Sequence, residues 1–204
     1  MRPKLWKFER MAAGMGYQVV AGVDEVGMGP LAGPVVGGAV VLRIGDRIPG
    51  LNDSKQMTAD EREQADRIIR RRAVAVSVCA VDHTHVDRLG LYKARILAHA
   101  GAVAGLSVKA EYLLIDAFDI PDTPLPQMAV VRGDKVCASI MAASIVAKVH
   151  RDRLMIAYDS QFPGYGFTVH KGYATAAHRR ALRELGPSPI HRMSWAPIRA
   201  VLAN

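Results

Sequence analysis

The chain has 204 residues, half of them hydrophobic and 23% charged, which excludes a disordered chain and allows one domain with a sizeable core. It holds no run of 18 uncharged apolar residues, and its first residues lack the apolar stretch of a secretion signal, so we expect a cytoplasmic protein without a membrane segment. Lys and Arg number 27 against 19 Asp and Glu, and the formal charge of +8 is compatible with a polyanionic partner without identifying one.

The N-terminal part of the chain predicts two strands joined by a short turn. Residues 19–24 form an apolar, β-branched run typical of a buried strand, and residues 35–42 form a second one. Between them, residues 27–30 read Gly-Met-Gly-Pro, a combination that interrupts regular structure. The pattern therefore predicts a hairpin or meander at the start of a sheet.

Helix and strand patterns alternate in the middle of the chain. A helix is predicted over residues 58–72, because its Thr-Ala-Asp-Glu start has the form of a capping box. Alternating valines over residues 74–78 predict a third strand, and apolar residues at helical spacing over residues 84–103 predict a second helix. The last two strands are expected at residues 112–115 and 128–131.

The C-terminal third has a different character. Residues 137–149 are small or apolar on nearly all sides, which predicts a helix buried in the centre of the fold. Later residues form Gly- and Pro-rich loops with aromatic and basic side chains. We therefore expect a single α/β domain over residues 1–204, with a sheet-based core at about 17–155 and a mostly helical part at about 156–204.

Four acidic residues stand at or just beyond the ends of predicted strands. Asp24 and Glu25 lie where the first strand meets the glycine-rich turn. Asp116 ends the fourth strand, and Asp134 follows the fifth. Each one alone is explained by the preference of Asp for turns. Neighbouring strands of one sheet would bring all four to one edge, where like charges repel unless a cation neutralises them.

Clustered carboxylates indicate a particular chemistry. They are hard oxygen ligands of the kind that Mg²⁺ and Mn²⁺ prefer. Two such ions about 4 Å apart activate a water and stabilise the leaving oxygen in phosphodiester cleavage. A basic protein with an acidic pocket fits that reaction, because Lys and Arg hold the polyanion while the ions act at one phosphate.

The wording of the motifs adds a family resemblance. Residues 23–35, VDEVGMGPLAGPV, resemble the first signature of bacterial ribonuclease HII, a type 2 ribonuclease H. Further segments follow in the family's order over nearly the whole chain. They are LNDSK at 51–55, the strand ending at Asp116, GD at 133–134, AASIVAK at 142–148, RDR at 151–153, FPGYGF at 162–167, HKGY at 170–173 and GPSPIHR at 186–192.

The resemblance implies a ribonuclease H-like fold, with a five-stranded mixed sheet, flanking helices and a C-terminal helical extension. It implies hydrolysis of RNA in RNA–DNA hybrids and incision 5′ to a single ribonucleotide in duplex DNA, leaving 3′-hydroxyl and 5′-phosphate ends. On this resemblance, the catalytic metal ligands are Asp24, Glu25, Asp116 and Asp134, which would hold two Mg²⁺ or Mn²⁺ ions.

Substrate recognition is expected at the glycine-rich turn. Only the 2′-hydroxyl distinguishes a ribonucleotide, and the small Gly27 and Gly29 allow the main chain to approach a sugar. The family's tyrosine corresponds to Tyr173, which would stack on the next sugar. Met28 departs from the family's arginine and cannot pair with a phosphate, so single-ribonucleotide cleavage is either retained through main-chain contacts or weakened. Ala174 replaces a usual glycine, a smaller departure.

Other residues have two interpretations each. Ser144 either bonds back to its own helix or reaches the nucleic acid. Asp53 is expected to brace its loop, and Cys79 and Cys137, in apolar surroundings, are expected to be reduced thiols. Phosphate contacts or plain surface charges are expected for Lys55, Lys148, Lys171, Arg151 and Arg192.

Three functions remain open on the sequence. The first is a nuclease for ribonucleotides in duplex DNA, and the second is a hybrid-preferring ribonuclease H weakened at single ribonucleotides by Met28. The third is a nucleic-acid-binding protein without catalysis, against which the presence of all four acids argues. The expected partners are RNA–DNA hybrids and ribonucleotide-containing duplexes, with the protein a monomer and no membrane involved.

Overall fold

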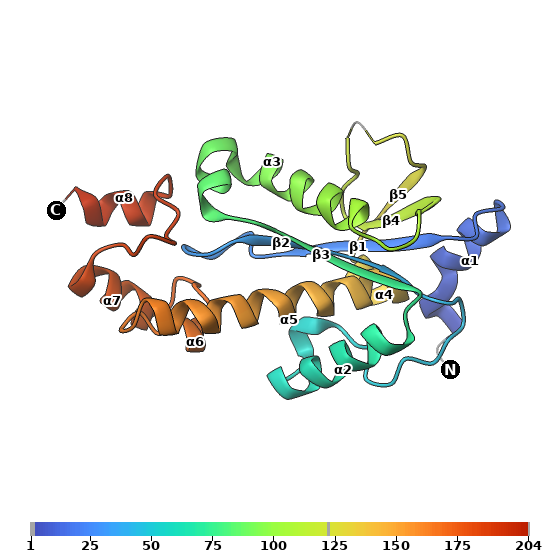
Figure 1. Cartoon of the computed structure of the whole chain (residues 1–204), viewed down its shortest axis with the longest axis horizontal. Coiled ribbons are helices and arrows are strands. Elements are labelled where there is room, and N and C mark those ends of the chain that lie inside the picture. Colours follow the sequence, from blue (N-terminus) through green and yellow to red (C-terminus); the bar gives the residue numbers. More distant parts are fainter. Residues whose placement is uncertain (1–2, 122, 204) are drawn as a thin grey trace.

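The computed structural model describes residues 3–121 and 123–203 as a five-stranded mixed sheet with helices on both faces (Figure 1). The strand order is β3-β2-β1-β4-β5. β2 is antiparallel to both β1 and β3, whereas β4 is parallel to β1 and β5 is parallel to β4. This confirms the predicted fold class and the initial meander. The strands are β1 (Val20–Val26), β2 (Val35–Val41), β3 (Ala75–Val81), β4 (Tyr112–Asp116) and β5 (Gln127–Val130).

The helices form two layers and an end group. Figure 1 shows α3 on one face of the sheet, α5 and α2 on the other, and α6, α7 and α8 together at one end. The described helices are η1 (Pro3–Trp6), α1 (Lys7–Gly14), η2 (Ser54–Gln56), α2 (Ala59–Arg72), α3 (His83–Ala104), α4 (Gly133–Val136), α5 (Ala138–Gln161), α6 (Phe167–His170), α7 (Ala176–Leu185) and α8 (Ala196–Leu202). Within the described part of the chain, no helix is long and apolar enough to cross a membrane.

The central helix is buried as predicted, and small residues let it approach the sheet. A side chain at Gly38 of β2 would place its Cβ 2.5 Å from the carbonyl oxygen of Ala143 in α5. On the other face, a Cβ at Gly37 would lie 2.4 Å from the carbonyl oxygen of Ala98 in α3. Both contacts are shorter than van der Waals distance, so glycine is required for two helices to pack this closely on β2.

Several predicted boundaries shift in the structure. β1 continues to Val26, because its antiparallel pairing with β2 extends past Asp24 and Glu25 to Val36. The two acids are therefore strand residues rather than turn residues. α5 continues to Gln161, so the expected division between residues 155 and 156 falls inside one unbroken helix. The sheet core and the C-terminal part thus share an element.

Local capping signals behave as predicted, and one distant cap was not foreseen. Thr58 and Glu61 form the capping box of α2, and Asp53 caps η2 by accepting from the Lys55 N–H at 3.0 Å. At the start of α5, the side chain of Glu9 from α1 accepts from the N–H of Ser139 at 2.8 Å. The two cysteines are free thiols, as expected.

Candidate active site

The four predicted acids lie at one end of the sheet. β1 and β4 are parallel neighbours, so Asp24 in β1 and Asp116 at the end of β4 stand side by side, and Asp134 lies in α4 just beyond. Burial, then the negative charges of Glu25 and Asp116, raises the pKa of Asp24 well above its usual value. Burial, then the charge of Asp134, raises the pKa of Asp116. Asp24 and Asp116 therefore lie close enough to other carboxylates for their negative charges to repel.

Each carboxylate also has its own donor. Across residues 3–121 and 123–203, no three His, Cys, Asp or Glu side chains are arranged closely enough to hold a metal ion as they stand. The donor set suits a hard divalent cation in chemistry, and three of the carboxylates accept hydrogen bonds from the protein. Oδ1 of Asp24 accepts from the Glu25 N–H at 2.7 Å, Oδ1 of Asp116 from the Gly133 N–H at 2.7 Å, and Oδ2 of Asp134 from the Lys55 ammonium at 2.7 Å.

Glu25 faces the opposite side of the sheet from Asp24. Successive strand residues point to opposite faces, so Asp24 faces α5 and Glu25 faces α3. There, Oε2 of Glu25 lies 2.8 Å from Nε2 of His99, a residue of α3 that is only 2% exposed. His99 therefore positions a predicted metal ligand. The sequence offered no signal for this role beyond a histidine on the apolar face of a helix.

Asp24 borders a cavity of about 300 Å³. The Ser144 hydroxyl hydrogen-bonds Asp24 and lies 3.0 Å from the Ser54 hydroxyl. Ser144 therefore hydrogen-bonds Asp24 and Ser54 rather than a carbonyl of its own helix. The cavity is lined by Asp24, Glu25, Val26, Ser54, Lys55, Arg62, Ser144, Lys148 and Tyr173.

The glycine-rich turn is held from below by Arg192, which is fully buried. Its guanidinium donates to the main-chain carbonyls of Gly27 at 2.6 Å, Met28 at 3.3 Å and Gly33 at 2.9 Å. The prediction of a phosphate contact at Arg192 is therefore wrong for this structure. Its donors serve the main chain, because a buried guanidinium must find acceptors.

Arg151 of α5 also donates to main-chain carbonyls, so the prediction of a phosphate contact at Arg151 is wrong for this structure as well. It is fully buried and donates to the carbonyls of Ala32 and Pro34 at 3.0 and 2.9 Å, and to that of Lys171 at 3.0 Å.

In a trans peptide the N–H points opposite to the carbonyl. With the carbonyls of Gly27 and Met28 drawn inward, the N–H groups of residues 28 and 29 point away from Arg192.

Met28 packs inward while its main chain stays at the turn. Its side chain is partly buried against an apolar cluster that includes Val86 and Leu91 of α3. Across the turn, a Cβ at Gly29 would lie 3.8 Å from Cε1 of Tyr173, whose side chain is 40% exposed. The structure therefore places Gly29 beside Tyr173, while the Met28 side chain packs against the apolar cluster at α3.

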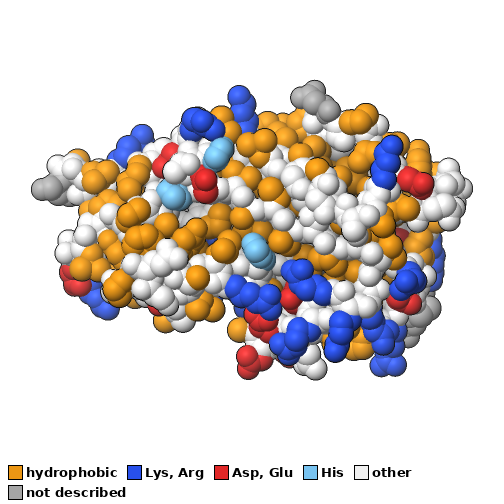
Figure 2. Space-filling view, viewed as in Figure 1, with side chains coloured by type: hydrophobic (Ala, Val, Ile, Leu, Met, Phe, Trp, Pro, Cys, Tyr) orange, Lys and Arg blue, Asp and Glu red, His pale blue; other side chains and the backbone are white. Residues whose placement is uncertain are grey.

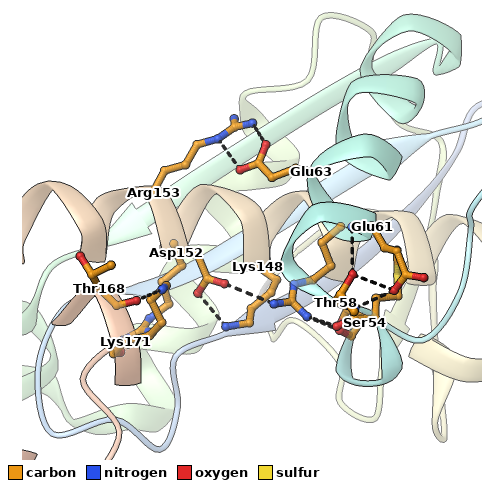
Figure 3. A network of polar contacts seen from close by, with 12 residues as sticks. Ser54, Thr58, Glu61, Glu63, Lys148, Asp152, Arg153, Thr168 and Lys171 are labelled. Carbon is orange, nitrogen blue, oxygen red and sulfur yellow. Dashed lines mark hydrogen bonds and ion pairs between the residues drawn. The ribbon is translucent and has the colours of Figure 1, made fainter. Parts of the chain in front are cut away.

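Most basic side chains on the α5 wall have internal partners. The Lys148 ammonium donates to Asp152 at 2.6 Å, and burial lowers the pKa of Lys148. Arg62 lies 3.8 Å from the same carboxylate, and Lys171 donates to the carbonyl of Thr168 (Figure 3). Lys55 is the exception in exposure, with 73% of its side chain open to solvent. Lys55 can therefore leave Asp134 at little cost in packing.

Comparison with solved structures places the fold. The ribonuclease H2 structure from Pyrococcus horikoshii OT3 superposes with a TM-score of 0.77 at 24% identity, covering 90% of this chain and 97% of that one. A structure of Bst-RNase HIII in complex with Mn²⁺ gives a TM-score of 0.68 at 22% identity, covering 94% of this chain and 71% of that one. Both likenesses establish the ribonuclease H-like fold.

Sequence comparison establishes the family. The ribonuclease HII family model matches residues 21–198. A ribonuclease HII from Geobacter metallireducens is 48% identical over 98% of this chain and 93% of its own length, and one from Cutibacterium acnes is 50% identical over 94% and 95%. The family model and these relatives cover nearly the whole chain, including the acids at the strand ends and the glycine turn. The chain therefore belongs to the ribonuclease HII family of metal-dependent endoribonucleases.

Proposed function

We propose that this ribonuclease HII hydrolyses RNA in RNA–DNA hybrids and also incises 5′ to a single ribonucleotide in duplex DNA, leaving 3′-hydroxyl and 5′-phosphate ends. One observation carries the second activity. The glycine turn, with its carbonyls fixed by Arg192, lies between the acidic strand ends and the exposed face of Tyr173. That arrangement offers main-chain donors beside a catalytic centre, which reading a single 2′-hydroxyl requires.

Asp24, Glu25, Asp116 and Asp134 are the residues we propose as ligands of two Mg²⁺ or Mn²⁺ ions. Two such ions supply an activated water and stabilisation of the departing 3′-oxygen. Burial, and then the repulsion of neighbouring carboxylates, raises the pKa values of Asp24 and Asp116. These shifts support the assignment, since a cation would relieve the repulsion. The ammonium of Lys55 on Asp134 occupies the place of a counter-ion in this structure.

The remaining residues hold the substrate. Tyr173 offers an exposed ring for a sugar beside the turn, and Lys55 offers a mobile charge for a phosphate. Lys148 and Lys171 line the groove between α2, α5 and α6, where both are already engaged within the protein. Figure 2 shows Lys and Arg side chains gathered over α2, which supports a polyanion-binding face next to this groove.

Met28 tests how the ribonucleotide is read. Its side chain packs against α3, so the main chain of the turn does not depend on a guanidinium at this position. We expect Met28→Arg to change the cleavage rate at a single ribonucleotide by less than about tenfold, the effect of adding one ionic contact. A gain of a thousandfold would instead support the hybrid-preferring alternative, in which the natural protein lacks an essential charge.

A single cleavage assay decides the function. Labelled duplexes containing one ribonucleotide, a uniform RNA–DNA hybrid and an all-DNA duplex are incubated with Mg²⁺ or Mn²⁺, and the cut sites are mapped. We expect cleavage of the first two, with the 5′ incision at the single ribonucleotide, and none of the third. Cleavage of the hybrid alone would reject the single-ribonucleotide activity, and activity in excess EDTA would reject the metal ligands.

A further inference from the structure

Arg95 forms an aromatic–cation–aromatic stack on α3. The Cζ atom of Arg95 lies 4.0 Å from the ring centroid of Phe118, which follows β4, and 5.5 Å from that of Tyr92 in the same helix. Arg95 is only 8% exposed, whereas Tyr92 is 60% and Phe118 54% exposed. Two large rings are therefore open to solvent beside the guanidinium.

The Arg95 guanidinium has no acceptor within the described part of the chain. It forms no ion pair with a carboxylate within 4.0 Å and donates no hydrogen bond there. Arg151 and Arg192, which are also buried, each donate to three carbonyl groups. None of the Arg95 nitrogens is among the buried side-chain atoms of the described residues that lack a partner, so these donors reach solvent. A guanidinium has five N–H donors, and those of Arg95 are open to an anion that approaches from solvent.

The stack lies beside the acidic residues. Arg95 precedes His99 by one helical turn on the sheet-facing side of α3, and His99 contacts Glu25 at 2.8 Å. Phe118 follows Asp116 by two residues, and its N–H donates to the Asp116 carbonyl at 2.7 Å. Arg95 thus lies on the α3 face of the sheet, opposite the face on which α5 carries Lys148.

We propose that Arg95 binds a backbone phosphate of the nucleic acid next to the linkage that is cleaved. This inference rests on the proposed function, because it takes a nucleic acid strand to pass the four acids. The rings of Tyr92 and Phe118 fix the guanidinium in place before the strand arrives, through cation–π contacts. A planar guanidinium suits this role, since it pairs with two oxygens of one phosphate.

The test measures binding without cleavage. A fluorescent single-ribonucleotide duplex is titrated with protein in EDTA at salt concentrations between about 50 and 200 mM, for the natural protein and for Arg95→Gln. Removing one phosphate contact is expected to weaken binding and to reduce the slope of log affinity against log salt by about 0.9. Arg43→Gln, which changes an exposed arginine beyond the end of β2 that lies away from the acids, is the matched control and should leave the slope unchanged.

A second variant guards against misfolding. Phe118 is exposed, so Phe118→Leu should fold normally, and we expect a smaller loss of affinity because Arg95 remains but is less fixed. An unchanged slope in a folded Arg95→Gln protein overturns the proposal, and so does full affinity in Phe118→Leu. Failure of the proposed function would show separately, as absence of cleavage by the natural protein with metal ions present.

Discussion

Two groups of buried charges near the end of β1 differ in whether the protein compensates them. Beneath the glycine turn, the guanidiniums of Arg151 and Arg192 donate to main-chain carbonyls, so the cost of burying them is offset. At the ends of β1 and β4, buried Asp24 meets other carboxylates and its pKa is raised. The protein therefore supplies hydrogen-bond acceptors to the two arginines that shape the turn. It leaves electrostatic repulsion among the carboxylates that we propose as ligands of a cation.

The largest effect is expected from Asp24→Asn. Loss of this proposed metal ligand should reduce cleavage by more than the roughly 100-fold that loss of an outer-shell partner costs. The same change should raise stability at neutral pH, because it removes a buried charge beside like charges. Cleavage rates and urea denaturation of both proteins measure the two effects together.

The sign of the pH dependence sharpens this prediction. When the pKa of a carboxyl is raised on folding, the folded protein becomes less stable as the pH rises from the usual pKa of the group to the raised pKa. Asp24→Asn should therefore exceed the natural protein in stability above that range, and the difference should shrink as the pH falls toward about 4. Lower stability of the variant at about pH 8 would contradict the view that this region is strained.

Arg192→Lys should break the compensated group. An ammonium cannot bridge the carbonyls of Gly27, Met28 and Gly33, and each buried carbonyl left without a donor costs about 1–3 kcal/mol. We expect the free energy of unfolding to fall by about 3 kcal/mol, measured by urea denaturation. Arg179→Lys, at an exposed position of α7, is the control, and an equal effect of both changes would refute the bracing role.

Acid should weaken the C-terminal part through two histidines. Nε2 of His178 lies 2.9 Å from Nε2 of His191, and Nδ1 of His178 donates to the Tyr173 carbonyl at 2.9 Å. Burial lowers the pKa of each histidine to about 4, and the charge of His178 contributes to the shift at His191. The network therefore requires neutral rings.

A lowered histidine pKa gives stability that is lost as the pH falls from about 6.5 toward 4, because the unfolded chain takes up protons first. We expect a loss of about 1 kcal/mol between pH 6.5 and 5 after allowance for solvent screening, measured by urea denaturation. His178→Gln should reduce this dependence. The same dependence in both proteins would assign it to other groups.

The smallest effect is expected from Lys55→Gln. The ammonium of Lys55 competes with a cation for Asp134, but it is 73% exposed, so the ion pair contributes at most about 1 kcal/mol. Mn²⁺ should therefore bind up to about fivefold more tightly to the variant in calorimetry. Lys135→Gln, which frees Asp53 instead, is the control. Weaker Mn²⁺ binding in Lys55→Gln would mean that Lys55 does not compete.

The sequence alone determined the elements and the position of the acids along the chain. The alternation of apolar residues, the capping box at Thr58 and Glu61, and the small or apolar residues of the first half of α5 act over a few residues, so they can be read locally. The resemblance to ribonuclease HII came from the motifs around Asp24 and Tyr173. Side-by-side placement of Asp24 and Asp116 followed from the expectation of one sheet.

Only the tertiary structure decided which charges are buried and what they touch. Arg192 and Gly27 are 165 residues apart, and Glu9 and Ser139 are 130 apart, yet each pair forms a hydrogen bond. Sequence reading placed Arg151 and Arg192 on a phosphate because an arginine's type does not reveal its burial. A charged side chain finds its partner through the packing of distant elements, and that packing is a property of the whole fold.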